Sequence, residues 1–205
     1  MTSLKSSSLI PIMESFYSIQ GEGFHSGKPA YFIRLSGCDV NCHWCDVKES
    51  WEISKEQYTS IDDIVNEVIK TSTDLVVITG GEPLMHDLSD LTKALKSEGK
   101  NIHIETSGTH PITGDFDWIC FSPKKFKKPL EIFFSISDEL KIIIYNKSDL
   151  QWAEELSHKV NENTQLIMQP EWSREELISP LILEYIKLNP KWRISVQTHK
   201  YLNVE

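Results

Sequence analysis

Short apolar runs alternate with amphipathic segments along most of this chain, and most of these runs end in glycine or polar residues. Such an alternation predicts an α/β fold with a parallel sheet whose apolar strands are buried on both faces. Ligands bind at the carboxyl ends of parallel strands, so we expect the functional residues there. The predicted strands are AYFIRLS (30–36), DLVVITGG (74–81), NIHIETSG (101–108), DWICFSPK (117–124), DELKIIIYN (138–146), TQLIMQP (164–170) and WRISVQT (192–198).

Four amphipathic segments between these runs predict helices, at 60–71, 86–99, 149–160 and 174–188. The first has a serine N-cap, Ser60, followed by apolar residues at the spacing of one helical face. We expect the last helix to break or kink near Pro180. The stretch 118–144 leaves little room for a full crossover helix, so the predicted helices are fewer than the predicted strands require.

Composition favours one ordinary globular domain over residues 1–205, with the polar residues 1–12 as a loose N-terminal extension. The net charge of -9 makes binding to nucleic acid or to acidic membranes unfavourable. Neither a membrane span nor a signal peptide is visible, so we expect a cytoplasmic protein. Four cysteines are too few for a disulfide scaffold, and metal binding or catalysis is the expected use.

Three of the four cysteines, Cys38, Cys42 and Cys45, fall within the stretch GCDVNCHWCD. Their spacing lets three thiolates converge on one small inorganic core, and favours an iron–sulfur cluster. The alternative is a structural zinc site with His43 or Cys120 as fourth ligand. Cys120 lies in a predicted buried strand, where a free cysteine usually behaves as a small hydrophobic residue.

The C-x3-C-x2-C loop, with the aromatic Trp44 before its last cysteine, resembles that of the radical S-adenosylmethionine (SAM) superfamily. The later TGGEP turn (79–83) resembles the superfamily motif that receives the amino group of the cofactor. The resemblance implies a 4Fe–4S cluster held by three cysteines, with SAM bound to the open iron. It also implies an incomplete (β/α)6 partial barrel with its ligands at the carboxyl ends of the strands.

Along almost the whole chain, the sequence is similar to the 7-carboxy-7-deazaguanine synthases of queuosine and related 7-deazapurine biosynthesis. The segments that carry this resemblance are FYSIQGEG, FIRLSGCDVNCHWCD, VVITGGEP, IETSGT, SPK, QP (169–170) and WRISVQTHKYLNVE. The resemblance implies conversion of 6-carboxy-5,6,7,8-tetrahydropterin to 7-carboxy-7-deazaguanine with loss of ammonia. In that chemistry a 5′-deoxyadenosyl radical abstracts hydrogen from C6 and the ring contracts, which makes the enzyme a carbon–nitrogen lyase.

The resemblance also assigns residues to each ligand. Cys38, Cys42 and Cys45 are expected to hold the cluster. The expected SAM contacts are Trp44, Cys45, Asp46, Gly81, Glu105, Ser122, Pro123 and Lys124, and the expected substrate contacts are Ile19, Gln20, Gly21, Arg34 and Thr79. Arg34 suits the pterin carboxylate because a guanidinium can donate two parallel hydrogen bonds. Glu22 and His199 are further candidates, for the polar edge of the pterin or for proton transfer.

Val47 departs from the family pattern, in which a threonine hydroxyl after the CD pair helps to bind Mg²⁺. Valine has no oxygen to offer a cation that prefers oxygen ligands, so magnesium binding is weakened, rebuilt from Asp46 or other oxygens, or dispensed with. The family also implies a homodimer and an electron donor such as flavodoxin or ferredoxin. Two alternatives stay open: a radical SAM activase that acts on a partner protein, and a non-catalytic zinc-binding protein.

Overall fold

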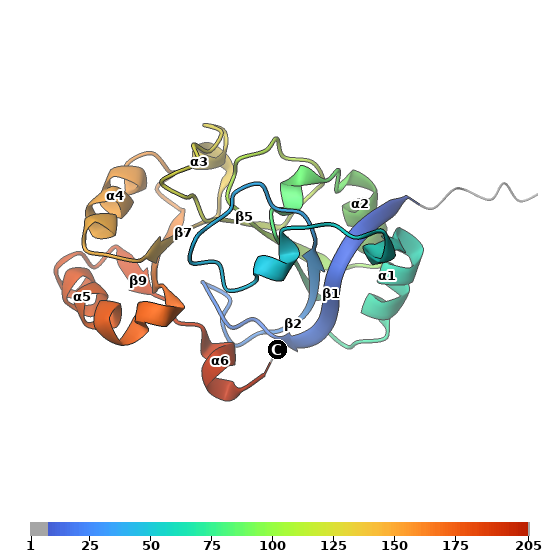
Figure 1. The fold of residues 1–205 in the computed structure, drawn as a ribbon, viewed down its shortest axis with the longest axis horizontal. Helices are drawn as coiled ribbons and strands as arrows, with labels where there is room; N and C mark the ends of the chain where they lie inside the picture. Colours follow the sequence, from blue (N-terminus) through green and yellow to red (C-terminus); the bar gives the residue numbers. More distant parts are fainter. Residues whose placement is uncertain (1–7, 205) are drawn as a thin grey trace, which may run out of the picture.

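The computed structural model describes residues 8–204. Within this range nine strands form one curved sheet in the order β3-β1-β2-β4-β5-β6-β7-β8-β9 (Figure 1). The run from β2 to β9 is parallel, as predicted, whereas β1 is antiparallel to both of its neighbours. The strands are β1 (Leu9–Ile19), β2 (Pro29–Leu35), β3 (Tyr58–Ser60), β4 (Leu75–Gly80), β5 (Asn101–Thr106), β6 (Trp118–Phe121), β7 (Glu139–Ile144), β8 (Gln165–Pro170) and β9 (Trp192–Ile194).

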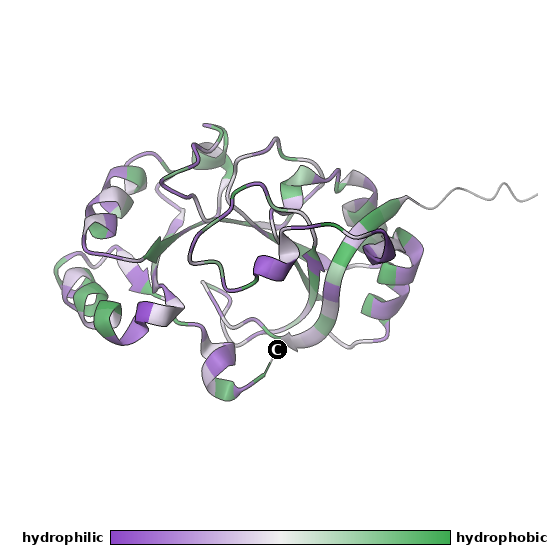
Figure 2. Ribbon diagram, in the orientation of Figure 1, coloured by the Kyte–Doolittle hydropathy of each residue, from purple (hydrophilic) through white to green (hydrophobic). Residues whose placement is uncertain are grey.

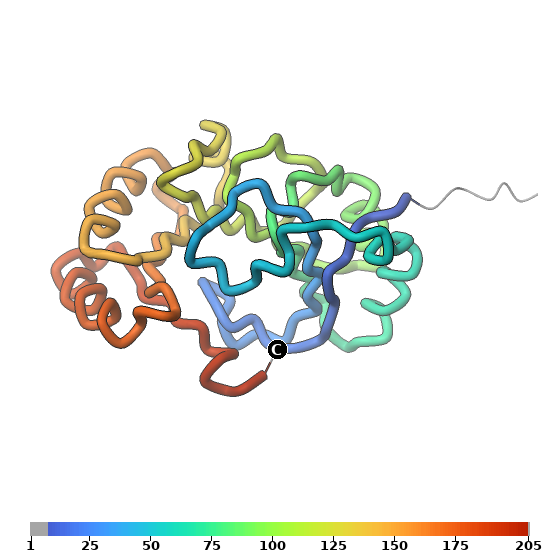
Figure 3. The backbone as a smooth tube through the Cα atoms, in the orientation of Figure 1, coloured from blue at the N-terminus to red at the C-terminus, as the bar shows by residue number. Residues whose placement is uncertain are grey.

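Helices lie around the outside of this curved sheet, and the chain path shows an incomplete ring (Figure 3). They are α1 (Ile61–Ile69), α2 (Ser89–Ser97), α3 (Phe133–Ile136), α4 (Ser148–Ser157), α5 (Glu175–Leu188) and α6 (Thr198–Leu202). No α-helix lies between β5 and β6 in this fully described stretch, and only the four residues of α3 lie between β6 and β7. The shortage of crossover helices that the sequence predicts is therefore confirmed. None of the helices in residues 8–204 combines the length and apolarity that a membrane crossing needs.

The strands β2 and β4 are apolar on both faces, as predicted, since Phe32 and Val77 belong to a second buried cluster on the face opposite the main core. On β7 the two faces differ in polarity, which corrects the prediction for that strand. In β7, Leu140, Ile142 and Ile144 are fully buried and belong to the main hydrophobic core. The alternate positions carry Glu139 and Lys141, because successive side chains of a strand point to opposite faces. The same alternation places Ile102 and Ile104 of β5 in the core. Figure 2 shows the mixture of hydrophobic and hydrophilic residues along the strands and helices.

The prediction of a loose segment over residues 1–12 is wrong where the structure can test it. Residues 1–7 lie outside the described range, but β1 begins at Leu9. Its first residues pair with β3, and the rest pairs with β2, where Phe16 stacks on Phe32 with ring centroids 5.2 Å apart. Tertiary pairing therefore orders a stretch whose composition alone suggests a coil.

Helix α5 continues through Pro180, so the predicted break is absent. Proline removes one backbone donor, which leaves the carbonyl of Glu176 without its helical partner. Both residues are exposed, so water can satisfy that carbonyl. Ile178 and Ile182 on the other side of the helix are buried in the core and hold it against the sheet.

The loop between β1 and β2, residues 20–28, packs inside the curve of the sheet. The Phe24 ring stacks on Trp118 with centroids 5.2 Å apart, and Arg193 lies over its other side at 5.0 Å. The backbone N–H of Phe24 donates to Glu139 at 3.1 Å. This loop thereby closes the space beneath the carboxyl ends of the strands.

Candidate active site

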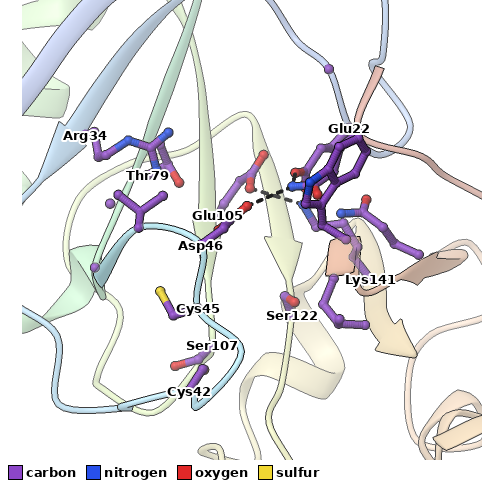
Figure 4. Close-up of a pocket in the computed structure, with 18 of the residues that line it drawn as sticks. Glu22, Arg34, Cys42, Cys45, Asp46, Thr79, Glu105, Ser107, Ser122 and Lys141 are labelled. Atoms are coloured by element: carbon purple, nitrogen blue, oxygen red, sulfur yellow. Dashed lines mark hydrogen bonds and ion pairs between the residues drawn. The ribbon is translucent and has the colours of Figure 1, made fainter. Parts of the chain in front are cut away.

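A cavity of about 390 Å³ opens at the carboxyl ends of the parallel strands. Every residue that the sequence assigns to a ligand lines it except Pro123, which is buried beside it. Figure 4 shows Arg34 and Thr79 on one side of the cavity, Glu22 and Lys141 on the other, and Cys42 and Cys45 below. The assigned lining residues are Ile19, Gln20, Gly21, Glu22, Arg34, Cys38, Cys42, Trp44, Cys45, Asp46, Thr79, Gly81, Glu105, Ser122, Lys124 and His199.

The cysteine loop follows β2 and crosses the open side of the sheet (Figure 1). Asn41 adopts a left-handed conformation (φ 54°), which turns the chain between the first two cysteines, and the N–H of Cys45 donates to the carbonyl of Cys42 at 3.0 Å. The thiols of Cys38, Cys42 and Cys45 are free and half-buried. Burial raises the pKa of Cys38, and it raises that of Cys42 to about 11.

These three thiols fit an iron–sulfur cluster better than a single metal ion. Within residues 8–204, no group of three His, Cys, Asp or Glu side chains is arranged to hold one ion. A cluster takes each cysteine at a different iron, so its ligands must stand farther apart than those of zinc. The thiols also face one shared cavity and form no disulfide. The donor set therefore suits a cluster with one iron left for a small-molecule ligand.

The two residues considered as a fourth zinc ligand are engaged elsewhere. The His43 ring packs edge-on against Trp44 and Tyr145, with centroid distances of 4.2 and 5.3 Å. Cys120 is buried in β6 and its Sγ lies 3.5 Å from Oε1 of Glu139. Burial and the neighbouring Glu139 raise the pKa of Cys120 well above its usual range, which disfavours the thiolate that a metal needs.

The Gly-Gly-Glu-Pro turn after β4 is built to approach the cysteine loop. Gly80 has φ +146°, and a Cβ there would lie 2.3 Å from the carbonyl oxygen of Leu35. A Cβ on Gly81 would lie 2.2 Å from the carbonyl oxygen of Gly37 and 2.8 Å from Cβ of Cys38. Only glycine lets the two backbones meet this closely.

Glu82, the acidic residue of this turn, lines the cavity and ties β4 to β5. Its buried carboxylate accepts hydrogen bonds from the hydroxyl of Thr106 (2.5 Å) and from the N–H and hydroxyl of Ser107 (2.8 and 2.5 Å). It also accepts from the N–H of Leu84 at 3.2 Å. The TGGEP and IETSG motifs are therefore one hydrogen-bonded unit, which the sequence alone did not reveal.

Glu22 and Glu105 share a lysine that the sequence analysis missed. Nζ of Lys141 lies 2.6 Å from Oε2 of Glu22 and 3.1 Å from Oε2 of Glu105. Burial opposes the ionisation of Glu22, but the charge and hydrogen bond of Lys141 outweigh it and lower the pKa of Glu22 to about 2. Lys141 alternates with the core residues Leu140 and Ile142, so the period-2 pattern of β7 could have revealed it.

Asp46 is bound by the C-terminal segment. Its Oδ2 accepts from Nζ of Lys200 at 2.6 Å and from Nε2 of Gln197 at 3.2 Å. Gln197 also donates to Oε1 of Glu22 at 2.8 Å, so it bridges the two acidic residues. Burial raises the pKa of Asp46, but the Lys200 hydrogen bond and charge lower it overall. Val47 lines the cavity beside Asp46 and offers no oxygen.

Gly21 and His199, predicted for different roles, are in direct contact. A Cβ on Gly21 would lie 2.1 Å from Nδ1 of His199, so the imidazole occupies the space that a side chain would fill. The N–H of Thr198 donates to the carbonyl of Gly21 at 2.9 Å. Burial lowers the pKa of His199. The QGEG loop and the QTHKYLN segment thus form one wall of the cavity.

Two cations complete the cavity. Nε of Arg34 donates to Oε1 of Glu14 on the paired strand β1 at 2.6 Å, an ion pair that leaves the terminal nitrogens as donors. Nζ of Lys124 donates to the carbonyl and the hydroxyl of Ser122 at 2.6 and 2.9 Å, and burial lowers its pKa. The protein is acidic overall, but positive groups meet the cavity from several sides.

This arrangement combines a curved parallel sheet with a three-cysteine loop over its carboxyl edge, and it defines a radical SAM enzyme. Consistently, the family model described as "Radical SAM superfamily" matches residues 32–119. Membership of that superfamily implies a 4Fe–4S cluster and SAM.

Comparison with known proteins shows to which family of this superfamily the chain belongs. The chain is 54% identical over 196 residues to a 7-carboxy-7-deazaguanine synthase of Flavobacterium psychrophilum, covering 96% of this chain and 93% of that protein. It is 47% identical to the enzyme of that name from Synechocystis sp., with 95% and 93% covered. A crystal structure of QueE from Escherichia coli matches with a TM-score of 0.82 at 32% identity, covering 93% of this chain and 95% of that one. The chain belongs to the 7-carboxy-7-deazaguanine synthase family, which confirms the resemblance seen in the sequence.

Proposed function

We propose that the protein converts 6-carboxy-5,6,7,8-tetrahydropterin to 7-carboxy-7-deazaguanine and ammonia. The observation that carries this proposal is one cavity that joins three free cysteines to a polar wall made by Arg34, Thr79 and Glu22. Loss of ammonia accounts for the whole difference in composition between the two compounds, so the net reaction needs no oxidant. Family membership supports the product, because the relatives carry its name.

The cysteine side of the cavity serves the cofactor in this proposal. Cys38, Cys42 and Cys45 hold the cluster, and the glycine backbone at Gly81 leaves room for the amino-acid part of SAM. Ser122 and Glu105 supply polar groups for the ribose and amine, and Lys124 supplies a cation. When bound, cluster and cofactor supply the one-electron chemistry that starts the reaction.

The opposite side binds the substrate. Arg34 receives the pterin carboxylate through its terminal nitrogens while Glu14 fixes its Nε. Glu22, held ionised by Lys141, accepts hydrogen bonds from the N–H groups of the pyrimidinone edge. Ile19, Gln20, Gly21 and Thr79 also line the cavity, and His199 forms the wall behind Gly21. The guanidinium of Arg34 meets the carboxylate end of the substrate, and the carboxylate of Glu22 meets its N–H end. Together these two contacts fix the orientation of the substrate.

Magnesium is not part of the proposed reaction. The residue beside Asp46 is Val47, and Oδ2 of Asp46 already pairs with the Lys200 ammonium. The oxygen donors that a hard cation requires are thus missing or taken at this place, and the fit to Mg²⁺ is poor. A homodimer, a flavodoxin- or ferredoxin-like electron donor and a cytoplasmic location complete the proposal on the strength of the family resemblance.

Anaerobic turnover tests the proposal. The reconstituted protein is mixed with the pterin, SAM and a reductant, and 7-carboxy-7-deazaguanine is followed by mass spectrometry. We expect a brown protein that forms the product. Formation of 5′-deoxyadenosine without product would retain the radical chemistry and refute the substrate, as an activase requires. A colourless protein that binds zinc and no iron would refute the entire assignment.

A further inference from the structure

Lys141 is a deeply buried cation of the cavity, and the sequence assigns it to no ligand. Its side chain is 4% exposed, yet its ammonium forms two ion pairs, with Glu22 and with Glu105 (Figure 4). A buried lysine is costly unless it is paired, so its place between the core residues Leu140 and Ile142 calls for a reason. The two partners come from different walls: Glu22 from the loop after β1, and Glu105 from β5.

Hydrogen bonds close these groups into a ring. Nε2 of Gln20 donates to Oε1 of Glu105 at 3.0 Å, and Oε1 of Gln20 accepts from the N–H of Glu22 at 3.0 Å. One oxygen of each carboxylate is bound to Lys141, so a movement of either carboxylate disturbs the other. Glu22 belongs to the substrate side in the proposed function and Glu105 to the cofactor side, so the ring spans both subsites.

We propose that Lys141 is a positioning residue that couples the substrate subsite to the cofactor subsite by holding Glu22 and Glu105 as fixed hydrogen-bond acceptors. The inference rests on the proposed function and assigns the ligand class of each acceptor. Glu22 takes the donor edge of a 2-aminopyrimidin-4-one ring, and Glu105 takes a hydroxyl or amine of the nucleoside cofactor. When one ligand fixes its carboxylate, the shared lysine fixes the other, so the second ligand binds more tightly.

The surroundings of Glu22 decide how its titration responds to loss of the lysine. Lys141 of β7 faces it, together with Gln169 of β8, Gln197 before α6 and His199 of α6. The nearest anions are Glu105 and, through Gln197, Asp46. Without Lys141, burial and these anions raise the pKa of Glu22 from about 2, and only the hydrogen bonds of Gln197 and Gln169 remain to lower it. A protonated carboxyl accepts fewer hydrogen bonds, so ligand affinity should then fall as the pH falls.

The test is equilibrium binding, without reductant, so that no turnover occurs. Affinity for 7-carboxy-7-deazaguanine is measured on the cluster-loaded protein between pH 5.5 and 8, with and without SAM. Wild type should bind with a flat pH profile and more tightly when SAM is present. Lys141→Met should weaken binding by roughly tenfold or more, most strongly at low pH, and abolish the effect of SAM. Lys141→Arg should restore part of both.

Controls separate this role from general destabilisation. Lys125→Met breaks another ion pair to a buried carboxylate, Asp149, but Lys125 does not line the cavity, so affinity and pH profile should match wild type.

Lys141→Met with wild-type affinity, a flat pH profile and an unchanged effect of SAM would overturn the inference. If Lys141→Met does not fold, the same binding measurement is made on Glu105→Gln. A variant that still binds the product but no longer binds it more tightly with SAM supports the inference. An unchanged effect of SAM overturns it. Wild type that fails to bind the product would refute the proposed function itself.

Discussion

Within the strand β7, the outer and inner faces of the curved sheet follow opposite rules. In β7 the outward side chains Leu140, Ile142 and Ile144 are fully buried in the core, whereas the inward Glu139 and Lys141 are buried in a polar network. The outer face is stabilised by apolar burial and needs no particular partner for each residue. The inner face needs a specific partner for every charge, so its residues carry the function and tolerate change less.

Cys42→Ala should give the largest effect, because it removes a ligand of the cluster from the inner side without touching the outer core. Turnover should be abolished, and bound iron should fall, while the melting temperature of the metal-free protein stays close to wild type. Product mass spectrometry, iron analysis and thermal unfolding measure the three quantities. Cys120→Ala is the matched control, since that thiol lies outside the cavity lining, and it should retain its iron. Turnover by Cys42→Ala would break the distinction at its base.

Ile142→Ala and Ile143→Ala compare the two faces at neighbouring positions. Ile142 is fully buried on the outer face, so its truncation should lower the free energy of unfolding by about 2–5 kcal/mol. Ile143 lines the cavity and is only half-buried, so its loss should cost less stability but change product affinity. Denaturant unfolding and equilibrium binding provide the measurements. Equal effects of both variants on both quantities would contradict the division between the faces.

Arg34→Lys sharpens the account of the inner face, because it keeps the charge and removes the planar fork. We expect kcat/KM for the pterin to fall by roughly ten- to a hundredfold, mostly through KM, as one of two charge-assisted hydrogen bonds is lost. Arg193→Lys, on a side chain that covers Phe24 outside the cavity, should leave the kinetics unchanged. A wild-type KM for Arg34→Lys would remove the residue from the substrate subsite.

Magnesium should give the smallest effect. Wild-type turnover should be the same in magnesium-depleted buffer and with added Mg²⁺, because Val47 supplies no oxygen and Lys200 already pairs with Asp46. In Val47→Thr a hydroxyl is available, and only this variant should respond to the ion. Steady-state rates at a series of Mg²⁺ concentrations decide the matter, and a steep rise for wild type would contradict the expectation.

Periodicity and motifs in the sequence were enough to predict the parallel sheet, because each apolar run makes its own strand and its own sharp end. The sequence did not predict the strands β1 and β3. Pro11 and the alternating polar residues of β1 are typical of coil, and β1 is ordered only because it pairs with β2 and β3. At Pro180 the sequence predicted a break where helix α5 continues. The effect of a proline in a helix depends on whether the carbonyl that loses its partner faces water or the core.

The site was predictable to the extent that its residues stand in motifs. Arg34, Thr79 and Glu105 sit at recognisable strand ends, and the cavity contains all three. Lys141 lies outside any motif, and Gln197 stands in the C-terminal motif without an assigned role. Both matter through partners more than 35 residues away in the chain. Pairings of this kind follow from register and strand order, which a single sequence does not state.

The contact between the QGEG loop and the C-terminal segment constrains how the protein is assembled during synthesis. The N–H of Gly23 donates to the hydroxyl of Ser195, which lies 172 positions later in the sequence. Nε2 of Gln197 donates to Oε1 of Glu22, and these residues are 175 positions apart. The first residues of the cysteine loop have a nearer partner, since the N–H of Gly37 donates to the carbonyl of Ser50. On the ribosome the three cysteines are therefore translated early, whereas this wall of the cavity forms only after almost the entire chain has been made.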